Sequence, residues 1–346
     1  MRKIFIHTYN DIISVDNLLS AWQEFRRDKR NKKDVQLFER NLMDNILELH
    51  TSLRNKTYVH SNYFHFKIND PKPRDIHKAS VGDRVIHHLL YQSLYKFFDN
   101  KFISDSYSCR FGKGTHKGIE KLRKFALKTS KNNTKPCFVL KCDIRKFFAN
   151  IDHGILKRIL HDNIQDYDIL NLLSIIIDSF NTQTAKPHFT NGNPWDWVGK
   201  GLPLGNLTSQ LLVNIYMNEF DQFVKHKLKV KYYIRYADDF VILSEDKKFL
   251  EELLPIINSF LDEHLKLNLH PDKVFIQSFA SGVDFLGWIH FSYHRVLRTT
   301  TKNRMWRRIA EQEYKEETIQ SYLGLLSHGN ANKITNALKL KYKNKI

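Results

Sequence analysis

The residues best suited to chemistry are two adjacent carboxylates in the run Tyr236-Ala237-Asp238-Asp239. The flanking runs, 231–235 and 240–243, are rich in aromatic and β-branched residues, which favour paired strands. Asp238 and Asp239 are therefore predicted at or beside the tight turn of a hairpin. Adjacent carboxylates repel each other unless a cation neutralises them, and Mg²⁺ prefers carboxylates together with substrate phosphates. Two interpretations follow, a metal site or an Asp-Asp turn on a surface hairpin.

A third acid, Asp143, ends another predicted strand over 138–143. Asp152 is predicted to cap the helix that follows. An antiparallel sheet can bring Asp143 beside the hairpin turn, although the two lie far apart in the sequence. Three converging carboxylates could hold two Mg²⁺ ions about 4 Å apart, the arrangement used for nucleotidyl transfer. Taken alone, an acid at a strand end is usually a helix cap or a surface residue.

The composition indicates a folded chain with an anionic partner. The 346 residues include 55 Lys and Arg against 37 Asp and Glu, a formal net charge of +18. An excess of this size favours a polyanion such as nucleic acid, although a single basic cluster can be a solvated face. The cysteines have no metal-ligand spacing, and the longest apolar run, 172–180, is too short to span a bilayer. We expect a soluble, cytoplasmic protein without a membrane partner.

Hydrophobic periodicity predicts a mixed α+β chain. Helices are expected from Ser14, from Asp34, over 81–98, from Asp152, near 167–180, after Gly205, over 249–261 and in the basic tail over 302–346. Strands are expected near 58–66, over 138–143, as a hairpin over 231–244, over 274–277 and over 285–291, with loops after residue 69, over 104–118 and over 181–205. The order β-α-α-β-β-α-β from 137 to 280 suits an antiparallel sheet backed by helices on one face.

From about residue 60 to residue 330 the chain resembles the reverse transcriptase family. The run Asp143-Ile144-Arg145-Lys146-Phe147-Phe148-Ala149-Asn150-Ile151-Asp152-His153 is similar to its first palm motif, and Tyr236-Ala237-Asp238-Asp239 to its second acidic motif. The resemblance implies a right-hand polymerase fold. The expected parts are an N-terminal helical extension (1–55), fingers (56–136), a palm (137–292, with a finger-like insertion near 161–200) and a short helical thumb (293–346).

The resemblance also implies roles for individual residues. Asp143, Asp238 and Asp239 would be catalytic carboxylates that bind two Mg²⁺ ions, for which Mn²⁺ could substitute. Lys273 sits where a lysine is thought to protonate the leaving pyrophosphate, and its alternative is a solvated lysine. The run Phe285-Leu286-Gly287-Trp288 resembles the family's primer-grip hairpin.

Further residues are expected at the incoming nucleotide. They are Lys72, Arg74, Arg145, Lys146, Phe148, Leu204, Gly205 and Gln210. Lys72 and Arg74 lie where the fingers contribute basic residues to the triphosphate, with an exposed basic loop as the alternative. Phe148 matches the steric gate that excludes a ribose 2′-OH, and its alternative is a core phenylalanine. The segment 105–114 resembles a further fingers motif that contacts the template.

The run Gly201-Leu202-Pro203-Leu204-Gly205-Asn206-Leu207-Thr208-Ser209-Gln210 departs from most of the family. Most members have Gln before the second glycine and Pro after the serine, where this chain has Leu204 and Gln210. The pattern resembles the reverse transcriptases of diversity-generating retroelements, which copy a template RNA into cDNA with frequent errors at adenines. The loss of an amide that fixes the nucleotide would loosen the geometric check on pairing. The alternative is that Leu204 only packs the loop.

The partners implied by the resemblance are a template RNA, a cDNA or primer, dNTPs and a small basic accessory protein that forms a ring. Only about fifty residues follow the primer-grip region, so we expect no maturase or endonuclease on this chain. One rival is another prokaryotic reverse transcriptase, in antiphage defence or tied to CRISPR adaptation. A rival of a different class is a catalytically silent RNA-binding scaffold.

Overall fold

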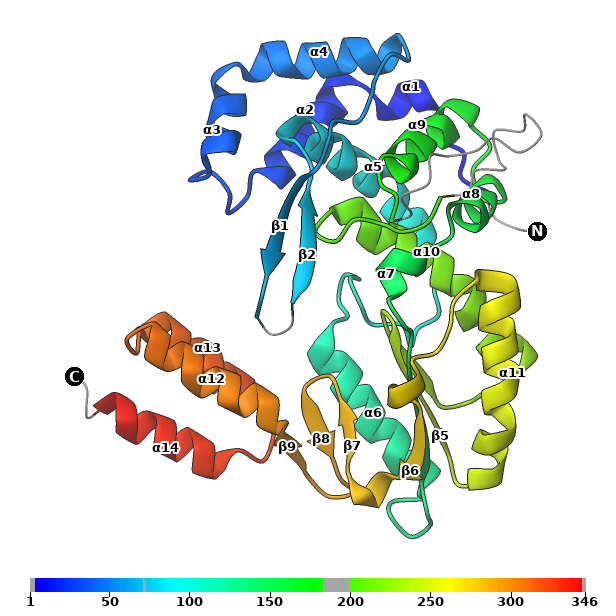
Figure 1. The fold of residues 1–346 in the computed structure, drawn as a ribbon, viewed down its shortest axis with the longest axis vertical. Helices are drawn as coiled ribbons and strands as arrows, with labels where there is room; N and C mark the ends of the chain where they lie inside the picture. The colour runs from blue at the N-terminus through cyan, green and yellow to red at the C-terminus, as the bar shows by residue number, and fades with distance from the viewer. Residues whose placement is uncertain (1–3, 71–72, 183–198, 344–346) are drawn as a thin grey trace. The chain divides into compact units, whose positions relative to one another are not determined.

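The computed structural model describes residues 4–70, 73–182 and 199–343. They form a mixed α and β chain with antiparallel sheets, drawn in Figure 1. The chain divides into two compact units, and each is described by itself. Unit 1 comprises Met1–Ser104, Ile144–Phe223 and Ser259–Asn268; unit 2 comprises Asp105–Asp143, Val224–Asn258 and Leu269–Ile346. Within the described ranges, none of the helices combines the length and apolar character that crossing a bilayer requires.

Unit 1 begins with four short helices. They are α1 (Tyr9–Ile12), α2 (Val15–Phe25), α3 (Lys33–Arg40) and α4 (Leu42–Arg54). Ser14 caps α2 as predicted, because its hydroxyl accepts a hydrogen bond from the N–H of Asn17. Leu18, Trp22 and Phe25 lie on one face of α2 and are buried.

The single helix predicted from Asp34 is wrong, because α3 and α4 are separate. The backbone of Asn41 leaves the helical region, with φ −115° and ψ 42°, and so breaks the helix. Asp34 lies inside α3 instead of capping it. Its carboxylate pairs with Lys78 and Arg84, which satisfies that charge without the helix N–H groups.

A two-stranded hairpin follows, formed by β1 (Phe64–Ile68) and β2 (Arg74–Lys78). Arg74 was predicted in a loop, but it is the first residue of β2, where pairing with Ile68 extends the backbone. Lys72 lies outside the described residues. The predicted helix over 81–98 is confirmed as α5 (Val81–Asp99), which packs against α2.

The remaining described helices of unit 1 are α7 (Phe147–Asn150), α8 (His153–His161), α9 (Tyr167–Asp178) and α10 (Leu207–Gln222), together with the end of α11 (Lys247–Leu265). Asp152 caps α8 as predicted, by accepting from the N–H of Ile155 at 3.0 Å. Helix α10 packs against α5 and α8. Most of the predicted loop over 181–205 lies outside the described residues.

Unit 2 contains a four-stranded antiparallel sheet in the order β4-β5-β3-β6. Its strands are β3 (Phe138–Asp143), β4 (Tyr233–Tyr236), β5 (Asp239–Ser244) and β6 (Phe275–Ser278). The strand over 138–143, the hairpin over 231–244 and the strand near 274–277 are therefore confirmed. The central pair, β3 and β5, places Asp143 directly opposite Asp239.

Both faces of this sheet are buried, and the helices predicted on one face came from the segment 137–280. Helix α6 (Thr115–Thr129), which the sequence patterns did not predict, packs on the face that carries Val139 and Val241. The opposite face is equally buried, through Leu140, Cys142, Phe240 and Ile242. In Figure 1, α6 lies on one side of the sheet and α11 on the other. The start of α6 falls in a Gly- and Ser-rich segment, which suggested a loop.

The C-terminal part of unit 2 is a small sheet followed by helices. The strands are β7 (Val283–Phe285), β8 (Trp288–His290) and β9 (Arg295–Leu297), and the helices are α12 (Thr299–Glu311), α13 (Glu316–Leu326) and α14 (Asn332–Lys343). The predicted strand over 285–291 is wrong, because a turn at Leu286 and Gly287 divides it. The prediction of a helical tail is confirmed, and its core includes Trp288, Met305 and Leu338.

Candidate active site

The two adjacent acids lie at the turn between β4 and β5. Tyr236 pairs with Asp239 in the strand ladder. Ala237 and Asp238 therefore form a two-residue turn, and Asp239 is the first residue of β5. Ala237 has a φ of 55°, a left-handed conformation that costs a residue with a Cβ about 1 kcal/mol or more. The strained residue Ala237 therefore directly precedes the two carboxylates, Asp238 in the turn and Asp239 at the start of β5.

Arg235 holds this turn in place. Its side chain is fully buried, and Nη1 donates to the carbonyl of Ala237 at 3.1 Å while Nη2 donates to Oγ of Ser106 at 3.2 Å. The backbone N–H of Arg235 also donates to the carbonyl of Asp105. A buried guanidinium needs such partners, so the turn and the 105–107 segment are fixed together. Sequence reasoning missed Arg235, whose only signal was an arginine inside an apolar strand.

Asp143 ends β3 opposite Asp239 and is paired with Lys273. The Lys273 ammonium donates to Oδ1 of Asp143 at 2.9 Å, and the lysine side chain is 42% exposed. The backbone N–H of His270 donates to the carbonyl of Asp143 at 2.8 Å, which ties the Pro271–Lys273 turn to the strand end. The structure therefore places Lys273 beside a candidate carboxylate, and its role as a proton donor stays a prediction.

Asp239 is the most perturbed acid of the group. Burial raises its pKa to about 7, the Lys141 ammonium opposes this rise, and the charges of Asp238 and Asp143 add to it. Oδ1 of Asp239 is buried and has no hydrogen-bond partner among the described residues. Such an orphaned carboxylate oxygen, inside the field of two further carboxylates, is typical of a functional site.

Lys141 is a second basic residue at this site that sequence reasoning missed. It lies on β3 two residues before Asp143, so both side chains share one face of the strand. Its Nζ lies 3.5 Å from Oδ2 of Asp239, and the residue is 8% exposed. The sequence signal that could have identified it is a lysine within a strand that was predicted to be buried.

A divalent cation fits this donor set. The described residues contain no group of three His, Cys, Asp or Glu side chains already arranged to hold a metal ion. Two of the three carboxylates face lysines instead, because Asp143 pairs with Lys273 and Asp239 with Lys141. The unpartnered Oδ1 of Asp239 and the mutual repulsion of the acids are what a cation would relieve.

A family model described as "Reverse transcriptase (RNA-dependent DNA polymerase)" matches residues 67–290, more than half of the chain. The chain belongs to the reverse transcriptase family. The matched range contains every residue given a candidate role above. The family's activity implies an RNA template, nucleotides and a divalent metal.

Individual relatives of this chain are distant. Protein YkfC of Escherichia coli K12 is 24% identical over 263 residues, covering 67% of this chain and 65% of the relative. The group II intron-encoded protein LtrA of Lactococcus lactis is 23% identical over 288 residues, covering 64% and 45%. A putative COX1/OXI3 intron 2 protein of Saccharomyces cerevisiae is 22% identical, covering 46% and 24%. The chain thus spans between a quarter and two thirds of these relatives.

Unit 1 carries the residues that were expected at the nucleotide. The carbonyl of Leu204 accepts from the N–H of His77 at 3.1 Å, and Nδ2 of Asn206 donates to the carbonyl of His77 at 3.0 Å. Gly205 has a φ of 107°, and a Cβ there would come within 3.1 Å of a β2 side chain. The structure therefore brings Leu204 and Gly205 against the strand that begins at Arg74.

For the other residues expected at the nucleotide, the structure gives a position and an exposure but does not test their role. Arg145 and Lys146 are exposed just before α7, and Lys146 has a φ of 46°. Phe148 is half-buried in α7, and Gln210 is half-buried in the first turns of α10. Their contacts with a nucleotide stay predictions.

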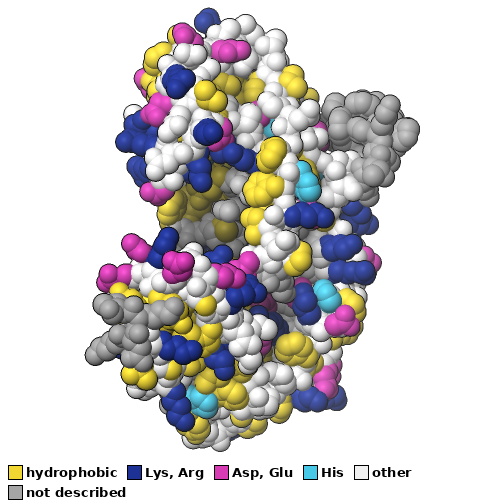
Figure 2. All heavy atoms as spheres, turned by 60° about the vertical axis from the view of Figure 1, so that its left-hand side comes forward, with side chains coloured by type: hydrophobic (Ala, Val, Ile, Leu, Met, Phe, Trp, Pro, Cys, Tyr) yellow, Lys and Arg dark blue, Asp and Glu magenta, His cyan; other side chains and the backbone are white. Residues whose placement is uncertain are grey.

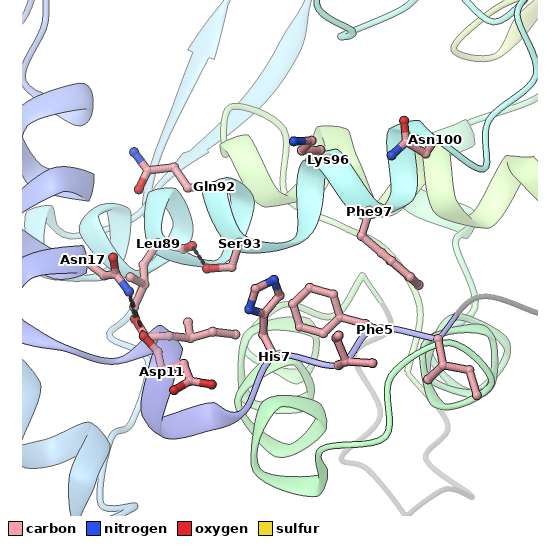
Figure 3. Close-up of a pocket in the computed structure, with 13 residues that line it drawn as sticks. Phe5, His7, Asp11, Asn17, Leu89, Gln92, Ser93, Lys96, Phe97 and Asn100 are labelled. Atoms are coloured by element: carbon pink, nitrogen blue, oxygen red, sulfur yellow. Dashed lines mark hydrogen bonds between the residues drawn. The ribbon is translucent and has the colours of Figure 1, made fainter.

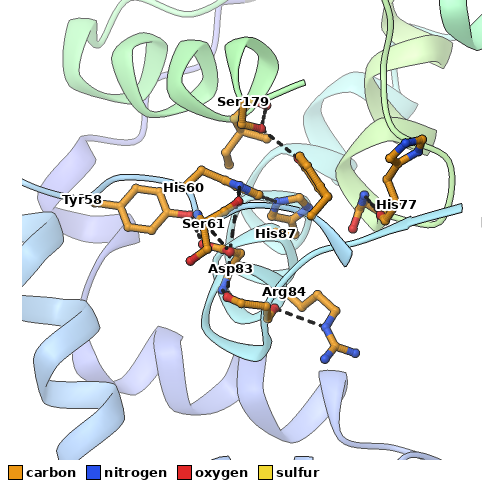
Figure 4. Close-up of polar contacts among 12 residues, drawn as sticks. Tyr58, His60, Ser61, His77, Asp83, Arg84, His87 and Ser179 are labelled. Atoms are coloured by element: carbon orange, nitrogen blue, oxygen red, sulfur yellow. Dashed lines mark hydrogen bonds and ion pairs between the residues drawn. The ribbon is translucent and has the colours of Figure 1, made fainter. Parts of the chain in front are cut away.

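A buried polar network anchors the start of α10 (Figure 4). Nδ1 of His87 lies 2.9 Å from Oγ1 of Thr208. Its Nε2 lies 3.1 Å from Nε2 of His60, and both rings are labelled in Figure 4. Nδ1 of His60 lies 2.7 Å from the carbonyl of Ser61, which can only accept. His60 therefore donates to Ser61, His87 donates to His60 and Thr208 donates to His87. Burial lowers the pKa of His87 to about 3, which keeps the His87 ring neutral.

Asp83 completes the network from the first turn of α5. Its carboxylate accepts from the hydroxyls of Tyr58 and Ser80, each at 2.7 Å, and from the N–H of Ser61 at 3.2 Å. Burial alone would raise the pKa of Asp83, but these hydrogen bonds outweigh it and hold the pKa below its ordinary value. This network gives α10 and the loop before it a fixed anchor.

The predicted primer-grip run forms the β7–β8 hairpin of unit 2. Phe285 pairs with Trp288, and both residues are buried. Leu286 and Gly287 have φ values of 51° and 86°, the pattern of a type I′ turn. The N–H of Arg298 donates to the carbonyl of Gly287 at 3.1 Å, which fixes the turn to the start of α12. Its contact with a primer stays a prediction.

A separate pocket of about 580 Å³ lies in unit 1, between the N-terminal segment and α5 (Figure 3). Two of its polar side chains bond backbone carbonyls nearby in the sequence. Nδ2 of Asn17 donates to the carbonyl of Asp11, and the hydroxyl of Ser93 donates to the carbonyl of Leu89. These bonds stabilise the helices, and none of the candidate site residues lines this pocket.

Proposed function

We propose that this chain is an RNA-directed DNA polymerase that makes cDNA from an RNA template by two-metal nucleotidyl transfer. The observation that carries the proposal is the pairing of Asp143 with Asp239 across β3 and β5, beside the turn that holds Asp238. The buried, unpartnered Oδ1 of Asp239 supports it, since a bound cation is one way in which such an oxygen is satisfied.

The three carboxylates would hold the Mg²⁺ ions, with Mn²⁺ as a substitute. When bound, these ions would stabilise negative charge on the attacking and leaving oxygens. Lys273 would donate a proton to the departing pyrophosphate, for which its half-exposed ammonium beside Asp143 is suited. Arg74, with Lys72, would bind the triphosphate, and Phe148 would exclude a ribose 2′-OH.

The proposed architecture is that of a right-hand polymerase. Residues 137–292 would be the palm, 56–136 the fingers and 293–346 the thumb, preceded by a helical extension over 1–55. The antiparallel sheet that carries the acids supports the assignment of the palm. The helices α12, α13 and α14 support the assignment of a helical thumb.

The partner would be nucleic acid, held largely through its phosphates. Figure 2 shows Lys and Arg side chains in several groups over the drawn face, interspersed with acids. Together with the formal net charge of +18, this distribution supports broad contact with a polyanion. Each neutralised phosphate releases counterions, so we expect affinity for a primer–template to fall steeply with salt.

A finer proposal is that the enzyme serves a diversity-generating retroelement and misincorporates at adenines. It rests on Leu204 and Gln210 in the loop and first turns of α10. The Leu204 backbone bonds to β2, while its side chain is only half-buried, so the side chain is available to a neighbouring nucleotide. A small basic accessory ring protein would then be the partner. The alternative roles, in antiphage defence or CRISPR adaptation, would be separated by gene neighbourhood.

The decisive experiment is primer extension on an RNA template with dNTPs and Mg²⁺. We expect extension by the wild type and none by Asp238→Asn. Asp246→Asn is the matched control, because it also removes an acid of unit 2, and Asn can still accept the hydrogen bond that Asp246 takes from Lys248. Equal activity of the wild type and Asp238→Asn would favour the silent RNA-binding scaffold.

Sequencing the products tests the retroelement proposal. We expect errors to concentrate opposite template adenines and to decrease several-fold in Leu204→Gln, because an amide restores a polar contact to the nucleotide. An error spectrum without adenine bias would remove the proposal and leave the polymerase assignment intact.

A further inference from the structure

Lys141 is a cation buried among the strands of the candidate site. The residue is 8% exposed, and burying an ammonium is costly unless close partners compensate for its lost hydration. Its Nζ donates to the carbonyl of Asp284 on β7 and lies 3.5 Å from Oδ2 of Asp239 on β5. The Phe275 ring on β6 lies 6.0 Å from the same nitrogen. One ammonium on β3 thus contacts residues of three other strands.

The two oxygens of Asp239 have different surroundings because of this contact. Oδ2 faces the Lys141 ammonium, whereas Oδ1 is buried without a partner among the described residues. An attraction to one oxygen only fixes the rotation of the carboxyl group. Lys141 therefore determines which oxygen is left to a cation.

The second contact of Lys141 leads to the β7–β8 hairpin. Asp284, whose carbonyl it binds, lies two residues before the turn residue Leu286. The Asp284 carboxylate pairs with Arg298, and the N–H of Arg298 donates to the carbonyl of Gly287. The Lys141 ammonium thus links Asp239 to the hairpin strand at Asp284. Asp284 is linked in turn, through Arg298, to the hairpin turn at Gly287.

We propose that Lys141 is a positioning residue of the polymerase, which holds the Asp239 carboxylate and the β7–β8 hairpin at one fixed spacing. This inference rests on the proposed function. Lys141 acts through Asp239 and Asp284, and it pairs with Oδ2 of Asp239 only, so that Oδ1 would remain as a ligand for a divalent ion. If the hairpin holds the primer end, the same ammonium sets the primer against the metal carboxylates.

Three variants test this inference. Lys141→Met keeps the length and removes the charge, and Lys141→Arg keeps the charge. Lys157→Met is the matched control, because Lys157 is also buried and pairs with Asp178 at 2.6 Å, in unit 1. For each variant we would measure Mn²⁺ binding without nucleic acid, by electron paramagnetic resonance, together with kcat and the KM for dNTP and the thermal unfolding midpoint.

Lys141→Met should bind Mn²⁺ several-fold more tightly, because a positive charge next to a ligand carboxylate is removed. Its kcat should nevertheless fall about 10- to 100-fold with little change in KM, because positioning acts on the reacting geometry. Lys141→Arg should recover kcat to within several-fold of the wild type. Lys157→Met should lower the unfolding midpoint without changing Mn²⁺ affinity.

The inference is overturned if Lys141→Met and Lys157→Met behave alike, with unchanged Mn²⁺ affinity and activity lost only in proportion to stability. It is also overturned if Lys141→Arg is no more active than Lys141→Met. A wild type that extends no primer would overturn the proposed function, and the role of Lys141 in polymerisation with it. The Mn²⁺ measurement separates the two failures, because it reports whether Lys141 faces the ion site even then.

Discussion

Two buried polar clusters of this molecule differ in how completely they are satisfied. In unit 1, His60, His87 and Thr208 form a chain in which each donor has an acceptor. In unit 2, Asp239 has one oxygen against a lysine and the other without a partner among the described residues. A satisfied network stabilises and orients the backbone, whereas an unsatisfied charge costs stability and persists where it serves a function.

The pKa shifts of the two clusters support the same distinction. Burial and neighbouring acids raise the pKa of Asp239, while burial lowers that of His87, so both groups resist ionisation. The histidine is satisfied in its neutral form by two hydrogen bonds. The aspartate needs a cation to be satisfied when ionised. Stability and activity should therefore respond in opposite ways when the clusters are altered.

The largest expected effect is that of Asp239→Asn on activity. Loss of a metal carboxylate should lower the primer extension rate by more than about 10³-fold, since metal-assisted stabilisation amounts to several kcal/mol. The free energy of unfolding should change by only about 1–2 kcal/mol, because two effects oppose each other: the substitution removes a buried carboxylate whose pKa is raised, but it also removes the charged partner of Lys141. Extension assays and denaturant titration measure the two quantities. A large loss of stability would show that Asp239 is a structural residue.

The opposite pattern is expected for Asp83→Ala. Three hydrogen bonds to a buried carboxylate are lost, so the free energy of unfolding should fall by about 2–4 kcal/mol. Activity per folded molecule should stay within about threefold, because the Asp83 carboxylate bonds Tyr58, Ser61 and Ser80 and none of the candidate site residues. Asp83→Asn keeps some acceptors and should lose less stability. A thousandfold loss of activity in folded Asp83→Ala would contradict the view that this cluster serves stability and the Asp239 cluster serves activity.

The pH dependence of stability should also differ in sign. For Asp239 the folded pKa, about 7, is above the ordinary 3.8, so its contribution to stability is lost as pH rises through that window. For His87 the folded pKa, about 3, is below the ordinary 6.5, so its contribution is lost as pH falls from 6.5 toward 3. Each effect should amount to a few kcal/mol.

Unfolding free energies of the wild type, Asp239→Asn and His87→Gln, measured with a chelator from pH 4 to pH 7, would test this. The difference between the wild type and Asp239→Asn should decrease with pH, and that between the wild type and His87→Gln should increase. Parallel curves would show that the surroundings of the two groups do not differ in this way.

The sequence predicted those parts whose signal is local. Ser14 and Asp152 are caps that their own segments identify, and the strands around Asp143 and Asp238 have a clear apolar pattern. The break at Asn41 and the helix over 115–129 were missed because neither has a strong local signal. Asp34 was predicted to start a helix, but it lies inside α3. Its carboxylate instead pairs with Lys78 and Arg84, which are distant in the sequence.

The candidate site was predictable in its acids but not in its basic residues. A motif gives the identity of Asp143, Asp238 and Asp239, whereas the roles of Arg235 and Lys141 depend on partners distant in sequence. Arg235 meets Ser106 and Lys141 meets Asp284 only because the sheet brings these segments together. Pairing at such sequence separation is set by the fold as a whole.

Mg²⁺ should stabilise one cluster and leave the other unaffected. At 10 to 100 times its dissociation constant, an ion that binds only the folded chain adds about 1.4 to 2.7 kcal/mol. Thermal unfolding of the wild type and of His87→Gln should show this increase, and Asp239→Asn should show much less. An equal response of all three would place the ion elsewhere on the chain.

The smallest effect is expected at the strained turn. Ala237→Gly removes the cost of a left-handed φ of 55° and should stabilise the chain by about 0.5–1 kcal/mol, less the extra entropy of the unfolded glycine. The same freedom loosens the backbone between Arg235 and Asp238, so the extension rate should fall several-fold while stability does not. Gly287→Ala is the converse control, since it introduces a Cβ at a φ of 86° in the β7–β8 turn and should destabilise by about 1 kcal/mol. If Ala237→Gly were both more stable and fully active, the strain at this turn would have no part in placing Asp238.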